Sequence, residues 1–161
     1  MRDFFLIYIL MSSIPDKIHS ILQPITEDLN TYIVEVILRG ERASKVIEVY
    51  VDSDSGITLE ECSIISRKLS EKLDEMDFIT GRYRLDVSSP GLDRSLKLLR
   101  QYQKNIGRNC KVKYKEHGIT VIQEGILESV SEKSIAIKKN GKLNEILFSN
   151  INETFIIPKI K

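Results

Sequence analysis

The chain has 161 residues, and its 24 Lys and Arg against 23 Asp and Glu leave a formal net charge of +1. Apolar residues make up 42% and charged residues 29%, a mixture that excludes fibrous, disordered and membrane-embedded classes. This length suffices for one hydrophobic core or two small ones. The two cysteines, Cys62 and Cys110, form no Cys-x-x-Cys pair, so we expect a reducing cytoplasm, no metal site and no cofactor.

The small net charge conceals two oppositely charged halves. Residues 1–91 carry 10 Lys and Arg against 16 Asp and Glu, giving −6, whereas residues 92–161 carry 14 against 7, giving +7. Such an asymmetry points to a nucleic-acid or nucleoprotein partner for the basic half. The alternative is that the two halves attract each other.

The first predicted segment is an N-terminal tail, residues 1–13. Its apolar run, residues 4–11, is too short to cross a bilayer as a helix, and no small-residue cleavage site follows it. We therefore expect neither a membrane span nor a signal peptide. Met11 directly precedes the first helix signal, so we expect translation to begin there or the segment to be a loosely attached tail.

Residues 14–91 predict an N-terminal domain with the order α-β-β-α-β. The apolar spacing changes from helical to alternating and back along this stretch. In chain order we expect a helix over residues 14–29, strands over 32–38 and 45–51, a helix over 58–77 and a strand over 82–87. The two helices would cover one face of a single sheet.

A cluster of acidic residues lies between the second strand and the second helix of this domain. Its members are Asp52, Asp54, Glu60 and Glu61. The spacing does not fit a calcium loop, because Gly56 falls at the fifth position of the loop instead of the sixth. Carboxylates at a helix start are favoured by the helix dipole, so solvated capping explains them better than acid–base catalysis.

Residues 92–107 predict a linker with a short helix, and residues 108–161 predict a small β-barrel. The barrel signals are short strands over residues 110–115, 119–130, 134–138, 144–148 and 154–157. Closure would remove the exposed edges that short sheets otherwise present.

One stretch, residues 94–115, holds many cations and not one Asp or Glu. The candidate RNA-binding residues in it are Arg94, Lys97, Arg100, Lys104, Arg108, Lys111, Lys113 and Lys115. Strand alternation places the last three on one face at about 7 Å intervals, which roughly matches phosphate spacing. The alternative is an edge strand protected by lysines. The cations of the predicted helix favour binding, by charge and without base reading.

The sequence offers little support for catalysis. It lacks the nucleophile-elbow, phosphate-loop, dinucleotide and zinc-protease motifs. A hydrolase using Ser88 or Ser89 would need a histidine within hydrogen-bond reach, and neither His19 nor His117 is placed by the pattern to supply one. We therefore expect no enzyme.

The segment over residues 83–94, Tyr-Arg-Leu-Asp-Val-Ser-Ser-Pro-Gly-Leu-Asp-Arg, closely resembles the bacterial ribosome maturation factor RimP family. The likeness extends to residues 49–52, 56–62 and 106–108, and covers roughly residues 14–158. The interdomain motif consists of Ser88, Ser89, Pro90, Gly91, Leu92, Asp93 and Arg94. Ser95 departs from the family, which usually has proline there.

The resemblance implies an α+β protein: an N-terminal domain with a KH-like layout, followed by an Sm-like, SH3-type barrel. It also implies a non-catalytic, cytoplasmic factor that binds the immature small (30S) ribosomal subunit, and we expect a monomer without small-molecule or membrane partners. From the charges we infer that the acidic cluster faces a ribosomal protein of the decoding region, while the cations face ribosomal RNA. The alternative is an Sm-like RNA chaperone that forms rings.

Overall fold

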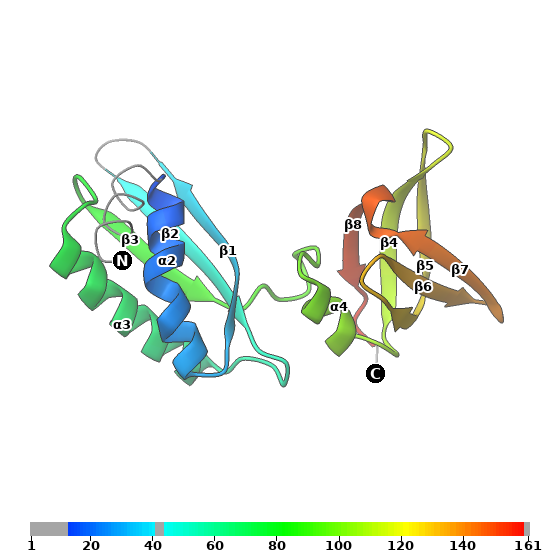
Figure 1. The fold of residues 1–161 in the computed structure, drawn as a ribbon, viewed down its shortest axis with the longest axis horizontal. Coiled ribbons are helices and arrows are strands. Elements are labelled where there is room, and N and C mark those ends of the chain that lie inside the picture. Colours follow the sequence, from blue (N-terminus) through cyan, green and yellow to red (C-terminus); the bar gives the residue numbers. More distant parts are fainter. Residues whose placement is uncertain (1–12, 41–43, 160–161) are drawn as a thin grey trace. The chain divides into compact units, whose positions relative to one another are not determined.

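Two separate hydrophobic cores form along the chain, one in each half. The computed structural model describes residues 13–40 and 44–159, and the chain divides into two compact units, Met1–Pro90 and Gly91–Lys161 (Figure 1). The predicted tail lies outside the described residues, apart from Ser13, which caps the first helix.

The first unit is a three-stranded sheet with two helices on one face. Its elements are α2 (Ile14–Asp28), β1 (Tyr32–Arg39), β2 (Lys45–Asp52), α3 (Leu59–Met76) and β3 (Tyr83–Ser88). The strand order is β1-β2-β3, with β1 antiparallel and β3 parallel to β2. Helix α2 packs on β1 and α3 packs on β3 (Figure 1). The predicted α-β-β-α-β order is confirmed.

Local chemistry explains where these helices begin and end. Ser13 and Asp16 form a capping box at the start of α2, and Thr58 and Glu61 form another at the start of α3. Helix α3 stops where Asp77 adopts a left-handed conformation with φ of 42°. The first core then gathers the apolar faces of both helices and of the central strand: Ile18, Leu22, Ile47, Val49, Val51, Ile65, Leu69 and Leu73 are all almost fully buried.

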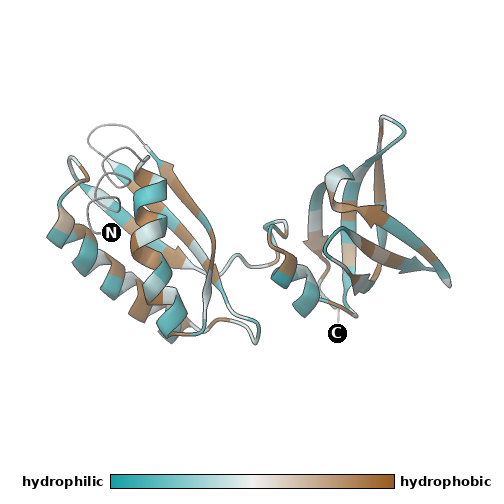
Figure 2. Cartoon of the chain, viewed as in Figure 1, coloured by the Kyte–Doolittle hydropathy of each residue, from teal (hydrophilic) through white to brown (hydrophobic). Residues whose placement is uncertain are grey.

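The second unit is a five-stranded antiparallel sheet preceded by a short helix. Its elements are α4 (Leu99–Lys104), β4 (Asn109–Glu116), β5 (Ile119–Val130), β6 (Ser134–Lys139), β7 (Lys142–Leu147), the 3-10 turn η1 (Phe148–Asn150) and β8 (Ile151–Ile156). Apolar and polar residues alternate along the strands (Figure 2). The predicted α+β class, with a later antiparallel sheet, is confirmed.

Side-chain hydrogen bonds link one end strand of this sheet to its interior strands. The strand order is β7-β6-β5-β4-β8, so β7 and β8 stand at its two ends. From β7, Asn144 Nδ2 donates to Gln123 Oε1 at 2.8 Å and to Tyr114 Oη at 3.1 Å, which lie on β5 and β4. The sheet therefore curls far enough for an end strand to reach the inner face of β4.

Strand β5 serves both halves of the curled sheet. Its residues up to Ile126 pair with β4, and its residues from Ile126 onward pair with β6. Gly125 lies at this changeover, where an added Cβ would stand only 2.6 Å from the carbonyl oxygen of Lys138. The close approach of β6 thus requires a residue without a side chain.

Helix α4 belongs to the second unit. Tyr102 is almost fully buried in the second core, and its ring meets that of Phe148 edge-on at 5.0 Å. The backbone N–H of Leu96 donates to the carbonyl oxygen of Thr154 on β8 at 2.8 Å. The stretch predicted as a linker, residues 92–107, is therefore packed against the sheet.

Candidate nucleic-acid interface

Strand β4 carries the row of lysines at the centre of the candidate interface. Cys110, Val112 and Tyr114 are buried, whereas Lys111, Lys113 and Lys115 are exposed. A strand with strict alternation of this kind turns one set of side chains to the core and the other to solvent. The three ammonium groups therefore share the outer face of the sheet.

Carboxylates from the neighbouring strands stand beside this lysine row. Lys111 lies opposite Glu124 on β5, and Lys113 lies opposite Glu153 on β8. The Lys113 Nζ and the Glu153 Oε2 are 3.7 Å apart, and both side chains are about half exposed, 46% and 47%. An exposed pair of this kind is weak, because water and salt screen it. The outer face is thus less cationic than the lysines alone suggest.

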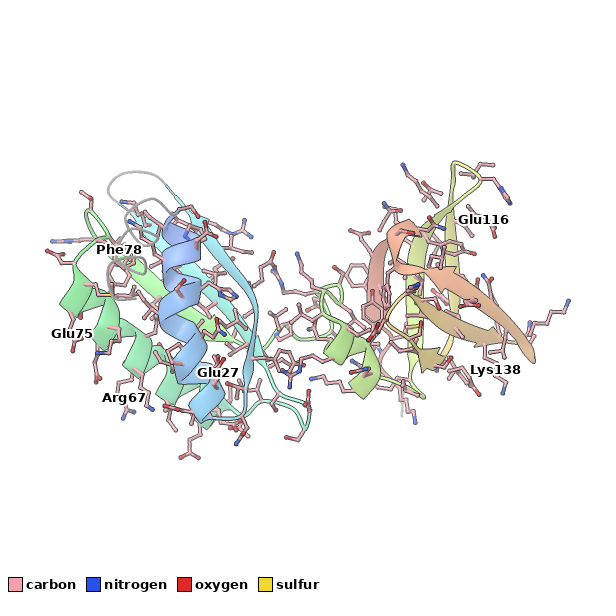
Figure 3. The ribbon with its side chains drawn as sticks, in the orientation of Figure 1. Glu27, Arg67, Glu75, Phe78, Glu116 and Lys138 are labelled. Carbon is pink, nitrogen blue, oxygen red and sulfur yellow. The ribbon has the colours of Figure 1, made fainter. Side chains whose placement is uncertain are left out.

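The sequence did not reveal Glu124 and Glu153 as parts of this surface. They lie 13 and 40 residues from their lysine partners, and only the register of the ladders brings them together. A second exposed pair joins Lys138 on β6 to Glu128 on β5, at 3.5 Å. Side chains of both signs therefore alternate on the outer face of this sheet, and Lys138 projects from it in Figure 3.

The remaining candidate cations lie before β4. Lys97 and Arg100 are exposed, whereas Arg94 and Lys104 are half-buried. Each of these four residues already makes an interaction in the structure. They precede or lie in α4 and belong to the same unit as the lysine row.

A small network of polar side chains fixes Arg108 at the start of β4. Its guanidinium donates to Asn105 Oδ1 at 2.9 Å, and Asn105 Nδ2 donates to the carbonyl oxygen of Gln101 at 2.7 Å. Gln101 and Asn105 are both almost fully buried. Gln101 Oε1 also accepts the backbone N–H groups of Lys97 and Leu98, which caps α4. The sequence reasoning missed this network, because nothing in the local pattern marks Gln101 and Asn105 as buried.

The acidic cluster of the first unit divides into structural and exposed members. Asp52 is buried, and its carboxylate accepts the backbone N–H of Ser53 at 2.9 Å. Glu61 accepts the backbone N–H of Thr58 at 2.7 Å and its hydroxyl at 2.9 Å, and these bonds lower the pKa of Glu61. Asp54 and Glu60 are exposed. Only the last two leave their carboxylates well exposed to solvent.

The other sequence candidates are dispersed. Ser88 and Ser89 are exposed at the end of β3, His19 is exposed on α2, and His117 occupies the β4–β5 turn with φ of 49°. Within residues 13–40 and 44–159, no group of three His, Cys, Asp or Glu side chains could hold a metal ion. None of the described helices is long and apolar enough to span a bilayer.

The interdomain motif lies where the two units meet in sequence. Ser88 ends β3, Pro90 is the last residue of the first unit, and Gly91 begins the second with φ of 63°. A positive φ of this kind is readily adopted by glycine, which has no Cβ.

Residues 21–93 match the family model of the RimP N-terminal domain. This match supports the RimP family. The match runs from the middle of α2 through β3 and ends within the interdomain motif, at Asp93. The likeness seen in residues 49–52, 56–62 and 83–93 is therefore confirmed, and RimP is a family of ribosome maturation factors. The lysine row of the second unit lies beyond the matched residues.

Proposed function

We propose that this RimP-family chain is a non-catalytic assembly factor that binds immature small ribosomal subunits in the cytoplasm. The match of residues 21–93 to the RimP N-terminal domain carries this proposal. The scattered positions of Ser88, Ser89, His19 and His117 support a role in binding rather than in catalysis.

In this proposal the second unit holds ribosomal RNA through the cations of residues 94–115. Support comes from the three lysines of β4, which share one exposed face at intervals suited to phosphates. Contacts of this kind position a protein without reading sequence. The carboxylates of Glu124 and Glu153 lower the affinity of the lysine row for ribosomal RNA. A weaker contact suits an assembly factor that must dissociate from the subunit.

The acidic first unit would face a basic ribosomal protein of the decoding region. Its exposed carboxylates at Asp54 and Glu60 support this division of labour, since residues 1–91 carry a charge of −6. We expect the protein to act as a monomer and to need no cofactor.

Co-sedimentation tests the proposal directly. The full chain is mixed with immature small subunits, with mature small subunits and with large subunits, and the pelleted fraction is measured at physiological salt. We expect binding to immature particles and much weaker binding to the others. Binding to mature particles only would contradict a maturation role.

One observation favours a second candidate, an Sm-like RNA chaperone. Strands β7 and β8 stand at the ends of their sheet, and end strands can pair with those of other copies. A ring would then form by such pairing. Light scattering decides between the two: a monomer at micromolar concentration excludes the ring.

A further inference from the structure

One aromatic ring lies on the outer face of the second sheet. On β8, Thr154 and Ile156 are almost fully buried, whereas Phe155 between them is only partly buried. Phe155 is in register with Lys111 on β4, the strand beside β8 (Figure 1). Residues directly opposite each other on neighbouring strands share one face of a sheet. The ring of Phe155 therefore lies next to the lysine row, on the face turned away from the second core.

The packing of the second unit makes little use of this ring. Among the residues that the structure describes, Phe155 belongs neither to the second core nor to the partly buried side chains packed against that core. It makes no ring contact and no cation–π contact with any described residue. Part of the ring surface is thus open to a ligand.

The lysines beside the ring differ in their partners. Lys113 is 3.7 Å from Glu153, but Lys111 and Lys115 form no ion pair with any described residue. Lys111 has Glu124 in register on one neighbouring strand and Phe155 in register on the other. Because two carboxylates accompany the three lysines, the face is only weakly cationic. Phosphate contacts alone would hold RNA weakly here, so a second source of affinity is needed.

Stacking on the ring supplies such a source. A base that stacks on an aromatic side chain adds affinity without charge, and it does so whatever its sequence. An apolar protein segment suits this face less well. The exposed apolar side chains of β5 on this face are Ile122 and Ile126, and the lysines of β4 separate them from Phe155. With a charge of +7 over residues 92–161, the surroundings favour an anionic ligand.

We propose that an unpaired base of single-stranded RNA stacks on Phe155 while Lys111 holds a neighbouring phosphate. Unpaired bases can turn outward, and aromatic side chains are common stacking partners for them. A duplex does not fit, because its bases are paired and stacked inside the helix. The proposal rests on the proposed function, in which the second unit holds ribosomal RNA. It adds that this RNA is unpaired where it meets β8.

A fluorescent variant tests the contact directly. The chain contains no tryptophan, so Phe155→Trp introduces a single indole at the proposed stacking position. We expect a single-stranded RNA to quench the indole fluorescence of this full-length variant, because a stacked base lies against the ring. A duplex of the same length should leave the fluorescence nearly unchanged. Absence of quenching by the single strand, or equal quenching by the duplex, would overturn the proposal.

Matched variants give a second test. Phe155→Leu keeps an apolar side chain but removes the ring, and we expect it to weaken binding of single-stranded RNA about fivefold or more. Stacking is uncharged, so the slope of log affinity against log salt should not change. Phe155→Tyr should bind like the original chain. Phe78→Leu, which removes the ring beneath Lys17 in the first unit, is the control.

Thermal melting checks that these variants fold. An equal loss of affinity in Phe155→Leu and Phe78→Leu would contradict the proposal, and so would a loss in Phe155→Leu that comes with a lower salt slope.

Immature small subunits separate this proposal from the proposed function. If the chain binds the particles and Phe155→Leu binds them equally well, the stacking proposal is wrong and the proposed function stands. If the chain does not bind the particles, both are wrong. If the particles change the fluorescence of Phe155→Trp but single-stranded RNA does not, the ring contacts a protein, and the RNA proposal is overturned.

Discussion

The hydroxyl of Tyr102 donates a hydrogen bond to Thr154 Oγ1 at 2.9 Å, which ties α4 to β8 inside the second core. Both residues are almost fully buried, and burial raises the pKa of Tyr102, so its hydroxyl stays protonated. Tyr102→Phe leaves Thr154 without this partner, and we expect it to lower the free energy of unfolding of the second unit by about 1–3 kcal/mol. Chemical denaturation measures the change.

Tyr83→Phe is the control for this prediction. The hydroxyl of Tyr83 donates to Asp74 at 2.9 Å, but that carboxylate is exposed to solvent and keeps water as a partner. We expect a smaller loss of stability. Equal losses in the two variants would show that burial of the hydrogen bond is not what matters.

Reversing the charge of the lysine row tests the RNA contact. We expect Lys111→Glu, Lys113→Glu and Lys115→Glu together to abolish association with immature small subunits at physiological salt. The neutral triple glutamine variant should lower the slope of log affinity against log salt by about 2–3, since each phosphate contact contributes about 0.7–0.9. Salt titrations of both variants measure this.

A control for the charge reversal is available in the same unit. Lys133, Lys139 and Lys142 are exposed on or beside β6 and β7, away from the lysine row. Their triple glutamate variant changes the net charge by the same amount. The RNA assignment is wrong if both triple variants behave alike, or if the first leaves the affinity unchanged.

Removing the carboxylate beside Lys113 should raise the affinity for RNA, whereas reversing the charge of the lysine row should lower it. Glu153→Gln releases the ammonium group from a pair of 3.7 Å and removes one repulsive charge from the face. Exposed pairs are weak, so we expect affinity for RNA to rise only about two- to fivefold. Glu128→Gln, which releases Lys138 from a similar pair, is the control. An equal gain there would assign the effect to net charge alone.

The capping box of α3 predicts a pH dependence of stability. Bonds from the backbone N–H and the hydroxyl of Thr58 lower the pKa of Glu61 below its ordinary value of 4.5. Its stabilisation is therefore complete at pH well above 4.5 and is lost as the pH falls through the lower, folded-state pKa. Glu61→Gln can still form the capping box but carries no charge. We expect the melting temperatures of the two proteins to differ at neutral pH and to converge in acid.

The two cysteines report separately on the two units. Cys62 lies in the first core and Cys110 in the second, and burial raises the pKa of both thiols, that of Cys110 to about 11. We expect neither to react with a disulfide reagent at pH 8 until its own unit opens. Single-cysteine variants assign the two labelling rates. Rapid labelling of the native chain would contradict the buried positions.

Local patterns were sufficient to predict the strand that carries the lysine row. Cys110, Val112 and Tyr114 alternate with lysines, so a strand here must turn these three side chains to the core and the lysines to solvent. The three side chains are buried in the structure. The second helix was likewise predicted to begin at residue 58, and Thr58 is the N-cap of α3. These signals depend on residues within a few positions of each other.

Contacts between distant residues could not be predicted. Thr154 accepts from Tyr102 across 52 positions of sequence, and Glu153 meets Lys113 through a ladder whose register the sequence leaves open. The short helix predicted within residues 92–107 is α4, which begins only at Leu99. The amide of Leu96 bonds to β8 instead of entering the helix.

The absence of a side chain at Gly125 has a consequence for how this sheet tolerates change. Any replacement there would push its Cβ against a carbonyl oxygen of β6 and against the side chain of Ile137. Even alanine would therefore force β5 and β6 apart. Because Gly125 pairs with Cys110, the displacement would also shift β4, the strand that carries the lysine row. Because Gly125 has a hydrogen atom where alanine has a methyl group, the single strand β5 can pair with β4 on one side and approach β6 closely on the other.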